Sequence, residues 1–343
     1  MNTGHMGSFQ SVVVLLCGLG TVAGLGGGCR RSPDELVVYC SVDEEFARAV
    51  LSEFQRRSGI KVDVLFDTEA GKTTGLVRRI EAERDRPRAD VFWSGEVFNT
   101  ILLTRQGLLH PYRPKTAEDI EARYRSPDDC WTGFGLRARV IAFNTTKLAR
   151  DHVPRRWSEL ADPHWAGQLV MANPQFGTTR GHVAAMFALW GSPQAADYLR
   201  RLKQHGVRIA DGNASAVRMV ARGEATLCLT DTDDVWVAQK RGWPVDLVYP
   251  TMSEGQGTLL IPNTVSILRG CRHLSSAQRI VDFLASAEVE RMLARSDSRN
   301  VPVRPALQRE LGITPPPGMS IDYAAVADAM TSAINEAREI LLR

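Results

Sequence analysis

Residues 36–66, LVVYCSVDEEFARAVLSEFQRRSGIKVDVLF, contain the pattern that decides the fold. The apolar run at residues 36–39 is typical of a buried strand. An acidic turn follows, and apolar side chains then recur every three or four residues until Gly59, which predicts an amphipathic helix that ends there. Residues 60–66 place apolar side chains at every second position, like another strand. Strand, helix and strand in this order predict one unit of a parallel sheet covered by helices.

The same rhythm continues along the chain and predicts an α/β protein with two lobes. Two strand-like runs, at residues 139–143 and 259–268, are placed to cross between the lobes as hinge segments. Lobe 1 is then expected to comprise residues 29–138 plus 264–343, and lobe 2 residues 139–263. A terminal helix over residues 324–342 is expected to pack back on lobe 1. In such a clamshell the carboxyl ends of the strands face a shared cleft, and hinge closure is the expected motion.

The first 28 residues are expected to be a signal peptide. Residues 12–25 are apolar and uncharged, and about 14 residues are too few for a membrane-spanning helix, which takes about 20. Small residues then lead to Cys29, an arrangement that resembles the cleavage site of a lipoprotein signal. We expect Cys29 to be lipidated and to anchor the mature protein to a membrane in the periplasm. Secretion without lipid, or a retained N-terminal anchor, are the alternatives.

Charge and cysteine content argue against several classes of protein. The 42 basic and 39 acidic residues give a net charge of +3, and the basic ones are scattered, so we expect no nucleic-acid partner. Cys40, Cys130, Cys228 and Cys271 lack the Cys-x-x-Cys spacing of a zinc site or redox pair. We expect four small buried side chains, and one or two disulfides are the alternative in an oxidising compartment.

A series of short motifs resembles the ferric-iron-type periplasmic solute-binding proteins of ABC transporters. The motifs are Val37-Val38-Tyr39 before an acidic helix, Ser58-Gly59-Ile60-Lys61-Val62, Ala89-Asp90-Val91-Phe92-Trp93, Asn173-Pro174 with Gly177-Thr178-Thr179, Gly223-Glu224-Ala225, and the stretch 296–303. Together they cover residues 36–305. The resemblance implies a type II periplasmic-binding-protein clamshell, a monomer that captures a solute and docks on a permease in the cytoplasmic membrane. It implies no catalysis and no resident cofactor.

The resemblance also implies iron(III) as the transported ligand. Members that bind bare iron typically use a histidine or tyrosine after the first strand, a glutamate after the Ala-Asp-Val strand and two consecutive tyrosines after a later strand. Here these positions hold Asp43, Gly95 or Glu96, and Asp234-Val235. Carboxylates are hard oxygen donors, so Asp43, Glu96 and Asp234 are the candidate metal ligands. Because the tyrosine pair is absent, a phosphorylated or carboxylated small molecule is the alternative ligand.

Turns between strands and helices supply the other candidate contacts. Residues 173–179 and 211–215 each open a helix, whose backbone N–H groups and positive dipole suit an anion, although Thr178 and Asn213 can equally serve as helix caps. The acidic run 231–234 is interpreted either as a cap or as ligand contacts. The expected ligand-binding set is Asp43, Glu69, Thr73, Glu96, Asn173, Gly177, Thr178, Thr179, Asn213, Ser215, Asp231, Asp233 and Asp234.

Few other residues indicate chemistry. Arg137 and Arg180 can reach an anion, but charged strand edges and helix faces explain them as well. His182 is expected on a helix surface, and the chain lacks the Gly-x-Ser-x-Gly and His-Glu-x-x-His motifs of hydrolases, so we expect no enzyme. A sensor lipoprotein that presents its closed form to a membrane receptor is the remaining alternative to an importer component.

Overall fold

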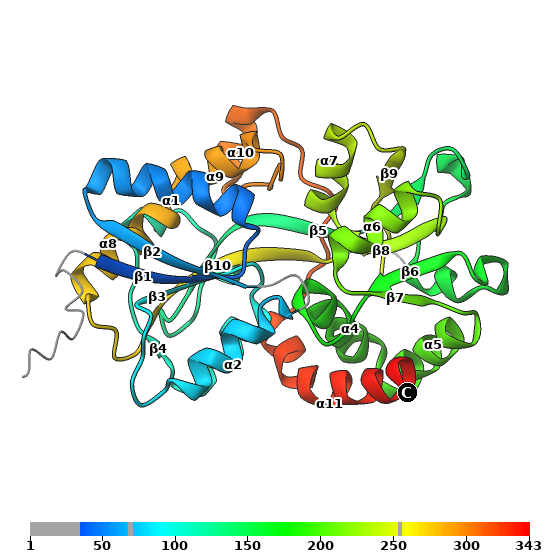
Figure 1. Ribbon diagram of the computed structural model, residues 1–343, viewed down its shortest axis with the longest axis horizontal. Coiled ribbons are helices and arrows are strands. Elements are labelled where there is room, and N and C mark those ends of the chain that lie inside the picture. The colour runs from blue at the N-terminus through cyan, green and yellow to red at the C-terminus, as the bar shows by residue number, and fades with distance from the viewer. Residues whose placement is uncertain (1–34, 68–70, 253–255) are drawn as a thin grey trace, which may run out of the picture. The chain divides into compact units, whose positions relative to one another are not determined.

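The long strand β5 (Thr132–Asn144) links two groups of strands in the computed structural model, which describes residues 35–67, 71–252 and 256–343 (Figure 1). The first half of β5 pairs with β10 (Leu260–Leu268), and its second half pairs with β8 (Leu227–Asp231) and β9 (Val245–Val248). The strand order is β2-β1-β3-β10-β5-β8-β6-β7, with β4 beside β10 and β9 beside β5. The α/β class predicted from the sequence is confirmed.

The first lobe is built around β1, which pairs in parallel with β2 and β3 as the opening stretch predicts. Strand β10 runs antiparallel to β3 and to β5, and its register shifts next to Pro262, which has no N–H group for the ladder. The elements of this lobe are β1 (Glu35–Cys40), α1 (Glu44–Ser58), β2 (Lys61–Phe66), α2 (Thr74–Ala82), β3 (Val91–Ser94), α3 (Phe98–Arg105), β4 (Leu109–His110), α8 (Leu274–Leu284), α9 (Ala287–Arg295) and α10 (Pro305–Leu311), with 3₁₀ turns η2 (Lys115–Ala117) and η3 (Ala122–Tyr124).

The second lobe is built around β8, which is parallel to β6 and antiparallel to β5. Helices again connect its strands, as the repeated sequence rhythm predicts. Its elements are η4 (Arg150–His152), η5 (Trp157–Ala161), η6 (Pro163–Trp165), β6 (Leu169–Ala172), α4 (Gly177–Trp190), α5 (Ser192–Gln204), β7 (Arg208–Ala210), α6 (Asn213–Ala221), α7 (Thr232–Lys240) and β9.

The terminal helix α11 (Tyr323–Leu342) packs mainly on α4 and α5, although it also touches α3 (Figure 1). The sequence predicts that this helix packs on the first lobe, whereas its main partners belong to the second lobe. The composition of α4 explains why. Nearly every residue of α4 between 178 and 187 is buried, so that helix is apolar all round and needs cover on the face turned away from the sheet. The segment that leads to α11 crosses beside the hinge, where the N–H of Met319 donates to the carbonyl of Thr258 (2.9 Å).

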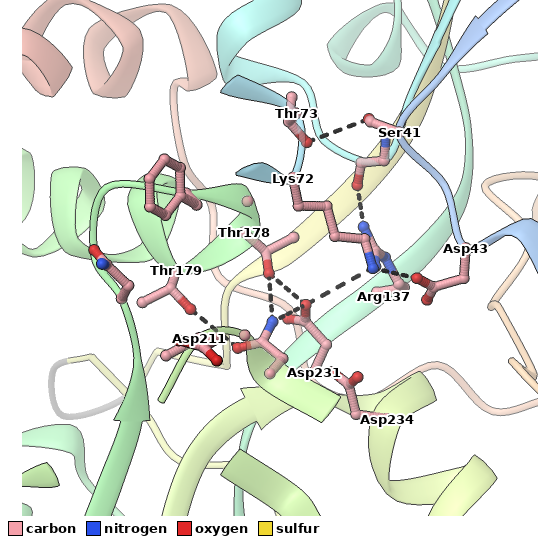
Figure 2. Close-up of a pocket in the computed structure, with 17 residues that line it drawn as sticks. Ser41, Asp43, Lys72, Thr73, Arg137, Thr178, Thr179, Asp211, Asp231 and Asp234 are labelled. Carbon is pink, nitrogen blue, oxygen red and sulfur yellow. Dashed lines mark hydrogen bonds and ion pairs between the residues drawn. The ribbon is translucent and has the colours of Figure 1, made fainter. Parts of the chain in front are cut away.

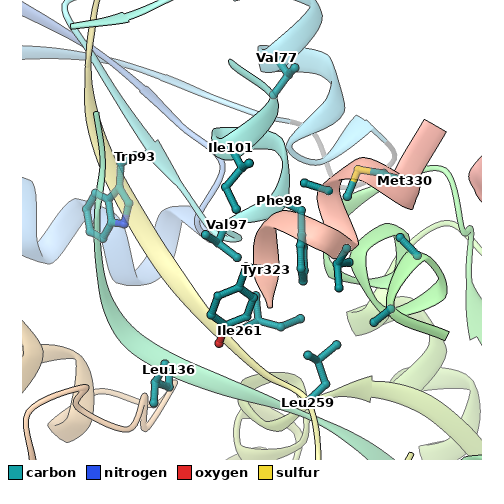
Figure 3. Packing of buried hydrophobic residues seen from close by; sticks show 14 of the residues in the cluster. Val77, Trp93, Val97, Phe98, Ile101, Leu136, Leu259, Ile261, Tyr323 and Met330 are labelled. Atoms are coloured by element: carbon teal, nitrogen blue, oxygen red, sulfur yellow. The ribbon is translucent and has the colours of Figure 1, made fainter. Parts of the chain in front are cut away.

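Aromatic packing joins α3, α4 and α11 beside the hinge strands (Figure 3). The rings of Phe98 and Tyr323 meet edge to face with centroids 5.9 Å apart, and the Tyr323 hydroxyl donates to the carbonyl of Leu260 (2.8 Å). Gly181 of α4 faces the ring of Phe98, where a side chain would overlap the ring atoms. This packing ties the two lobes together on one side of the hinge.

Features expected near the N-terminus lie mostly outside the described residues. The signal peptide and Cys29 are among them. Within the described ranges, Cys40, Cys130 and Cys228 are buried, Cys271 is half-buried, and all four are unpaired. No helix of these ranges combines the length and the apolar character needed to cross a bilayer.

Candidate ligand-binding site

A cavity of about 30 Å³ lies where loops of both lobes meet the hinge strand β5 (Figure 2). The loops after β1, β3, β6, β7 and β8 contribute to it, as expected for the carboxyl ends of parallel strands. It is lined by Ser41, Asp43, Lys72, Thr73, Gly95, Arg137, Ala172, Asn173, Phe176, Gly177, Thr178, Thr179, Asp211, Gly212, Asn213, Asp231 and Asp234.

Most candidate ligand-binding residues with described positions line this cavity. They are Asp43, Thr73, Asn173, Gly177, Thr178, Thr179, Asn213, Asp231 and Asp234. Glu96, Ser215 and Asp233 do not line it, and Glu69 lies outside the described residues. Two of the three candidate metal ligands, Asp43 and Asp234, therefore face the cavity, whereas the third does not.

Glu96 is turned away because its carboxylate accepts hydrogen bonds from the first turn of α3. The donors are the N–H groups of Phe98 (2.6 Å) and Asn99 (3.2 Å). Burial raises the pKa of Glu96, and the bonds from Asn99 and Phe98 oppose that shift. Ser215 likewise bonds within its own helix, where its hydroxyl accepts from Arg218 (2.8 Å). Both residues satisfy neighbouring groups of their own segment.

Thr178, Asn213 and Asp231 form a network instead of capping helices, in which Thr178 and Asp231 are buried and Asn213 is half-buried. None of them makes a side-chain cap, although Asp231 stands at the N-cap position of α7. The Asp231 carboxylate accepts from the Thr178 hydroxyl, from the amide of Asn213 (3.0 Å) and from the guanidinium of Arg139 (2.9 Å). The network thereby connects the starts of α4, α6 and α7 with strand β5.

Basic side chains pair with the carboxylates of the site. The Lys72 ammonium bonds to Asp43 (Figure 2). The guanidinium of Arg137 bonds to the Gly95 carbonyl and to Asp233 (3.0 Å). Burial works against ionisation of Asp43, but Lys72 and then Arg137 outweigh it, so the pKa of Asp43 lies below its usual value. The acidic residues of the cavity are thus partly neutralised by the protein itself.

Asp233 and Asp234 have raised pKa values. Burial is the main cause for both, and Arg137 opposes it only at Asp233. For Asp234 the neighbouring carboxylates of Asp233, Asp231 and Asp43 add to the effect and raise its pKa well above the usual value. Proton uptake by Asp234 therefore reduces the negative charge of the site.

His182 is fully buried, in contrast to the helix-surface position expected from the sequence. Its ring packs edge-on against Trp157 with centroids 4.2 Å apart, and its Nδ1 accepts from Nε of Arg139 (3.3 Å). Burial, and then the charge of Arg139, hold the pKa of His182 well below its usual value. A neutral imidazole thus supports Arg139 from behind the cavity. Arg180, the other candidate arginine, does not line the cavity.

Five residues in or beside the cavity are not among the candidates from the sequence, namely Ser41, Lys72, Phe176, Asp211 and Arg139. Ser41 directly follows β1, and residues at the carboxyl end of a parallel strand commonly lie at a ligand site. This position could therefore have identified Ser41 from the sequence. Its hydroxyl accepts from the N–H of Gly95 (2.9 Å) and from the hydroxyl of Thr73 (3.2 Å). Thr73 has φ +64°, a conformation that β-branched residues rarely adopt. Such strain is concentrated at functional sites.

Tyrosine is absent from the cavity. All six tyrosines of the chain lie within the described ranges, and none lines it.

The cavity is also closed over by hydrogen bonds between the lobes. The N–H of Gly177 donates to the carbonyl of Lys72 (3.0 Å), and the Thr74 hydroxyl donates to the carbonyl of Gln175 (3.2 Å).

Known proteins share this sequence pattern and fold. The family model for bacterial extracellular solute-binding proteins matches residues 87–316. An uncharacterised protein of Haemophilus influenzae is 30% identical over 273 residues, which cover 76% of this chain and 75% of that protein. Iron-bound HitA from Pseudomonas aeruginosa has a TM-score of 0.78 and 26% identity, covering 89% of this chain and 99% of its own. AfuA from Actinobacillus pleuropneumoniae, with fructose-6-phosphate bound, has a TM-score of 0.77 and 23% identity, covering 90% and 98%. The predicted two-lobed periplasmic-binding-protein fold is confirmed.

Proposed function

Because the chain belongs to the family of bacterial extracellular solute-binding proteins, we propose that it binds a hydroxylated organic phosphate in the periplasm and delivers it to the permease of an ABC importer. Proteins of this family bind solutes for transport and are not enzymes. We also propose that the protein is a monomer and has no nucleic-acid partner. The contacts of the site indicate the class of ligand, because one fold can carry different ligands.

The observation that carries this proposal is a set of hydrogen-bond donors around the cavity, at the starts of α2 and α4. Ser41, Thr73, Thr178 and Thr179 place hydroxyl groups at the cavity, and Lys72 places an ammonium group there. Thr73, Thr178, Thr179 and Lys72 donate to protein acceptors in this structure, so they would exchange these partners for the ligand. The first turn of α4 adds backbone N–H groups that lack partners within the helix. Such donors, with the positive end of a helix dipole behind them, suit a phosphate dianion.

Carboxylates on the second-lobe side of the cavity supply acceptors. Asp211, Asp231 and Asp234 line it there, and carboxyl oxygens accept hydrogen bonds from hydroxyl groups. A ligand with a phosphate at one end and hydroxyl groups at the other satisfies both sets. The cavity of about 30 Å³ is far smaller than such a ligand, so binding requires the lobes to open and reclose.

Iron(III) as the bound ligand is supported less well by these contacts. Bare Fe³⁺ needs several free, charged oxygen donors. Asp43 is engaged by Lys72, Asp231 by Arg139 and Asp233 by Arg137, and no phenolate lines the cavity. The fold does not choose between the two ligands, because HitA was solved with iron and AfuA with a sugar phosphate.

Calorimetric titration of the purified protein tests the ligand class. We expect hexose phosphates to bind, and the same hexoses without phosphate to bind at least ~100-fold more weakly, since charged hydrogen bonds contribute about 1.5–3 kcal/mol each. A panel of hydroxy-carboxylates tests whether a carboxylate group can replace phosphate. Tight binding of ferric citrate together with no response to any phosphate ester would reject the proposal in favour of iron.

A matched pair of lysine variants locates the binding site. Lys72→Met removes the ammonium in the cavity, and we expect it to weaken phosphate-ester binding by ~10-fold or more. Lys61→Met removes an exposed lysine of β2 that pairs with Glu35, and its affinity should stay at the wild-type level. Equal affinities of the two variants would show that the phosphate binds elsewhere.

Membrane attachment is the second part of the proposal. Lipid on Cys29 would hold the binding protein at the membrane near its permease. Labelling of cells with a fatty-acid analogue should mark the wild type and leave Cys29→Ala unlabelled. Equal labelling of both proteins would exclude Cys29 as the attachment site.

A further inference from the structure

The guanidinium of Arg137 lies beside two of the acidic residues at the start of α7. Its Nη1 is 3.0 Å from Asp233 and 3.9 Å from Asp231, and its Nη2 bonds to the carbonyl of Gly95. Figure 2 shows the side chains of Arg137 and Asp231. The side chain lines the cavity although the residue is only 9% exposed. A guanidinium group is always charged, so this pairing is permanent.

The carboxylates beside Arg137 have the spacing of a metal site. Asp231, Asp233 and Asp234 each offer an oxygen atom, and these atoms lie within 4.8 Å of one another. Asp43 approaches from the first lobe and acts on the charge of Arg137. Hard cations bind clusters of this kind when the carboxylates are free. Here the cluster already contains its own cation.

The guanidinium is held firmly but not saturated. Strand β5 fixes the backbone of Arg137, and the N–H of the next residue, Ala138, donates to the hydroxyl of Thr232 (3.2 Å). Within the described residues, Nε of Arg137 and Oδ1 of Asp233 are both buried without a hydrogen-bond partner. A buried group without a partner is costly, so the guanidinium and the carboxylate each keep one atom that can still take a hydrogen bond.

We infer that Arg137 is the specificity-determining residue of this site, an internal counter-cation that excludes metal ions from the carboxylates and leaves the cavity to anions. The inference deepens the proposed function, since it rests on an anionic ligand. It makes a prediction that does not depend on which anion binds. Removal of this one positive charge frees Asp233 beside Asp234, while Arg139 still pairs with Asp231 and Lys72 with Asp43. The cluster should then accept hard metal ions.

Titration of variants with Mn²⁺ and Tb³⁺ alone tests the inference. We expect Arg137→Gln to bind these ions with a dissociation constant of about 1 mM or tighter, the range of carboxylate sites in extracellular proteins. Its thermal midpoint should be lower than that of the wild type and should rise by several degrees with metal. The wild type and Arg137→Lys, which keeps the charge, should show neither response.

A second variant covers the case in which Arg137→Gln does not fold, because loss of one partner of a buried ion pair costs about 3–5 kcal/mol. Arg137→Gln/Asp233→Asn removes the abandoned carboxylate and keeps Asp43, Asp231 and Asp234. We expect it to fold and to bind Tb³⁺ more tightly than the wild type by ~10-fold or more.

Two results would overturn the inference. In the first, the variants with an uncharged residue at position 137 fold but bind metal no more tightly than the wild type. The other is a wild-type protein that binds Tb³⁺ in this cavity as tightly as the variants do. Loss of that binding in Asp231→Asn would show that the ion occupies this cavity. Failure of the proposed function is a separate observation, because it is measured as absent binding of phosphate esters by the wild type.

Discussion

The protonation of a single residue, Asp234, should affect the stability of the unliganded protein. Its pKa in the folded chain is raised well above 3.8, first by burial and then by Asp233, Asp231 and Asp43. The folded state therefore retains a proton that the unfolded state releases, and stability falls as the pH rises from about 4 through the folded pKa. Ionised Asp234 is thus a cost at neutral pH.

Asp234→Asn should remove that cost. We expect the variant to be more stable than the wild type at pH 7 by ~1 kcal/mol, a typical single-site effect, with the difference vanishing below pH ~4. Urea unfolding across this pH range measures the difference. Asp197→Asn, on the exposed face of α5, is the control and should not change the slope. A loss of stability in Asp234→Asn at neutral pH would contradict the assignment.

At the scale of elements, the contact between α3 and α4 depends on a glycine. A methyl group at position 181 would overlap the ring of Phe98, which is itself fully buried. We expect Gly181→Ala to destabilise the protein by about 1–3 kcal/mol, the usual effect of overpacking, in spite of the higher helix propensity of alanine. Urea denaturation measures the change in the free energy of unfolding.

A double-mutant cycle separates the overlap from other effects of this substitution. Phe98→Leu in the Gly181→Ala background makes room for the methyl group and should recover part of the lost stability. The same Phe98→Leu substitution in the wild-type background should only destabilise, because it removes ring contacts with Tyr323. Strictly additive effects would mean that the helix contact is not the cause.

At the scale of the whole molecule, closure should depend on ligand. Hydrogen bonds between Lys72 and Gly177 and between Thr74 and Gln175 hold the cavity shut, so they form only when the lobes meet. We expect a phosphate ester at ~100 times its dissociation constant to add about 2.7 kcal/mol of stability and to reduce the radius of gyration. Calorimetry and solution scattering measure these quantities. Stabilisation without any compaction would argue against hinge closure as the binding motion.

The sequence by itself determined the local elements and their order. The alternation after Gly59 and the acidic turn before the first helix depend only on residues close in the chain, and β1, α1 and β2 lie where the pattern predicts. The turns at residues 173–179 and 211–215 follow strands, so their place at the edge of the cavity could also be predicted. Chain-local periodicity is sufficient for both inferences.

Only the tertiary structure decided where polar side chains point and what α11 covers. Glu96 follows a strand as predicted, yet its carboxylate bonds to the first turn of the next helix, α3. Asp231 stands at the N-cap position of α7 without a side-chain cap bond, and its carboxylate bonds to Arg139. His182 is buried because Trp157 and Arg139, both distant in sequence, enclose it. Each outcome depends on a partner that folding brings from elsewhere in the chain, and no local pattern contains that partner.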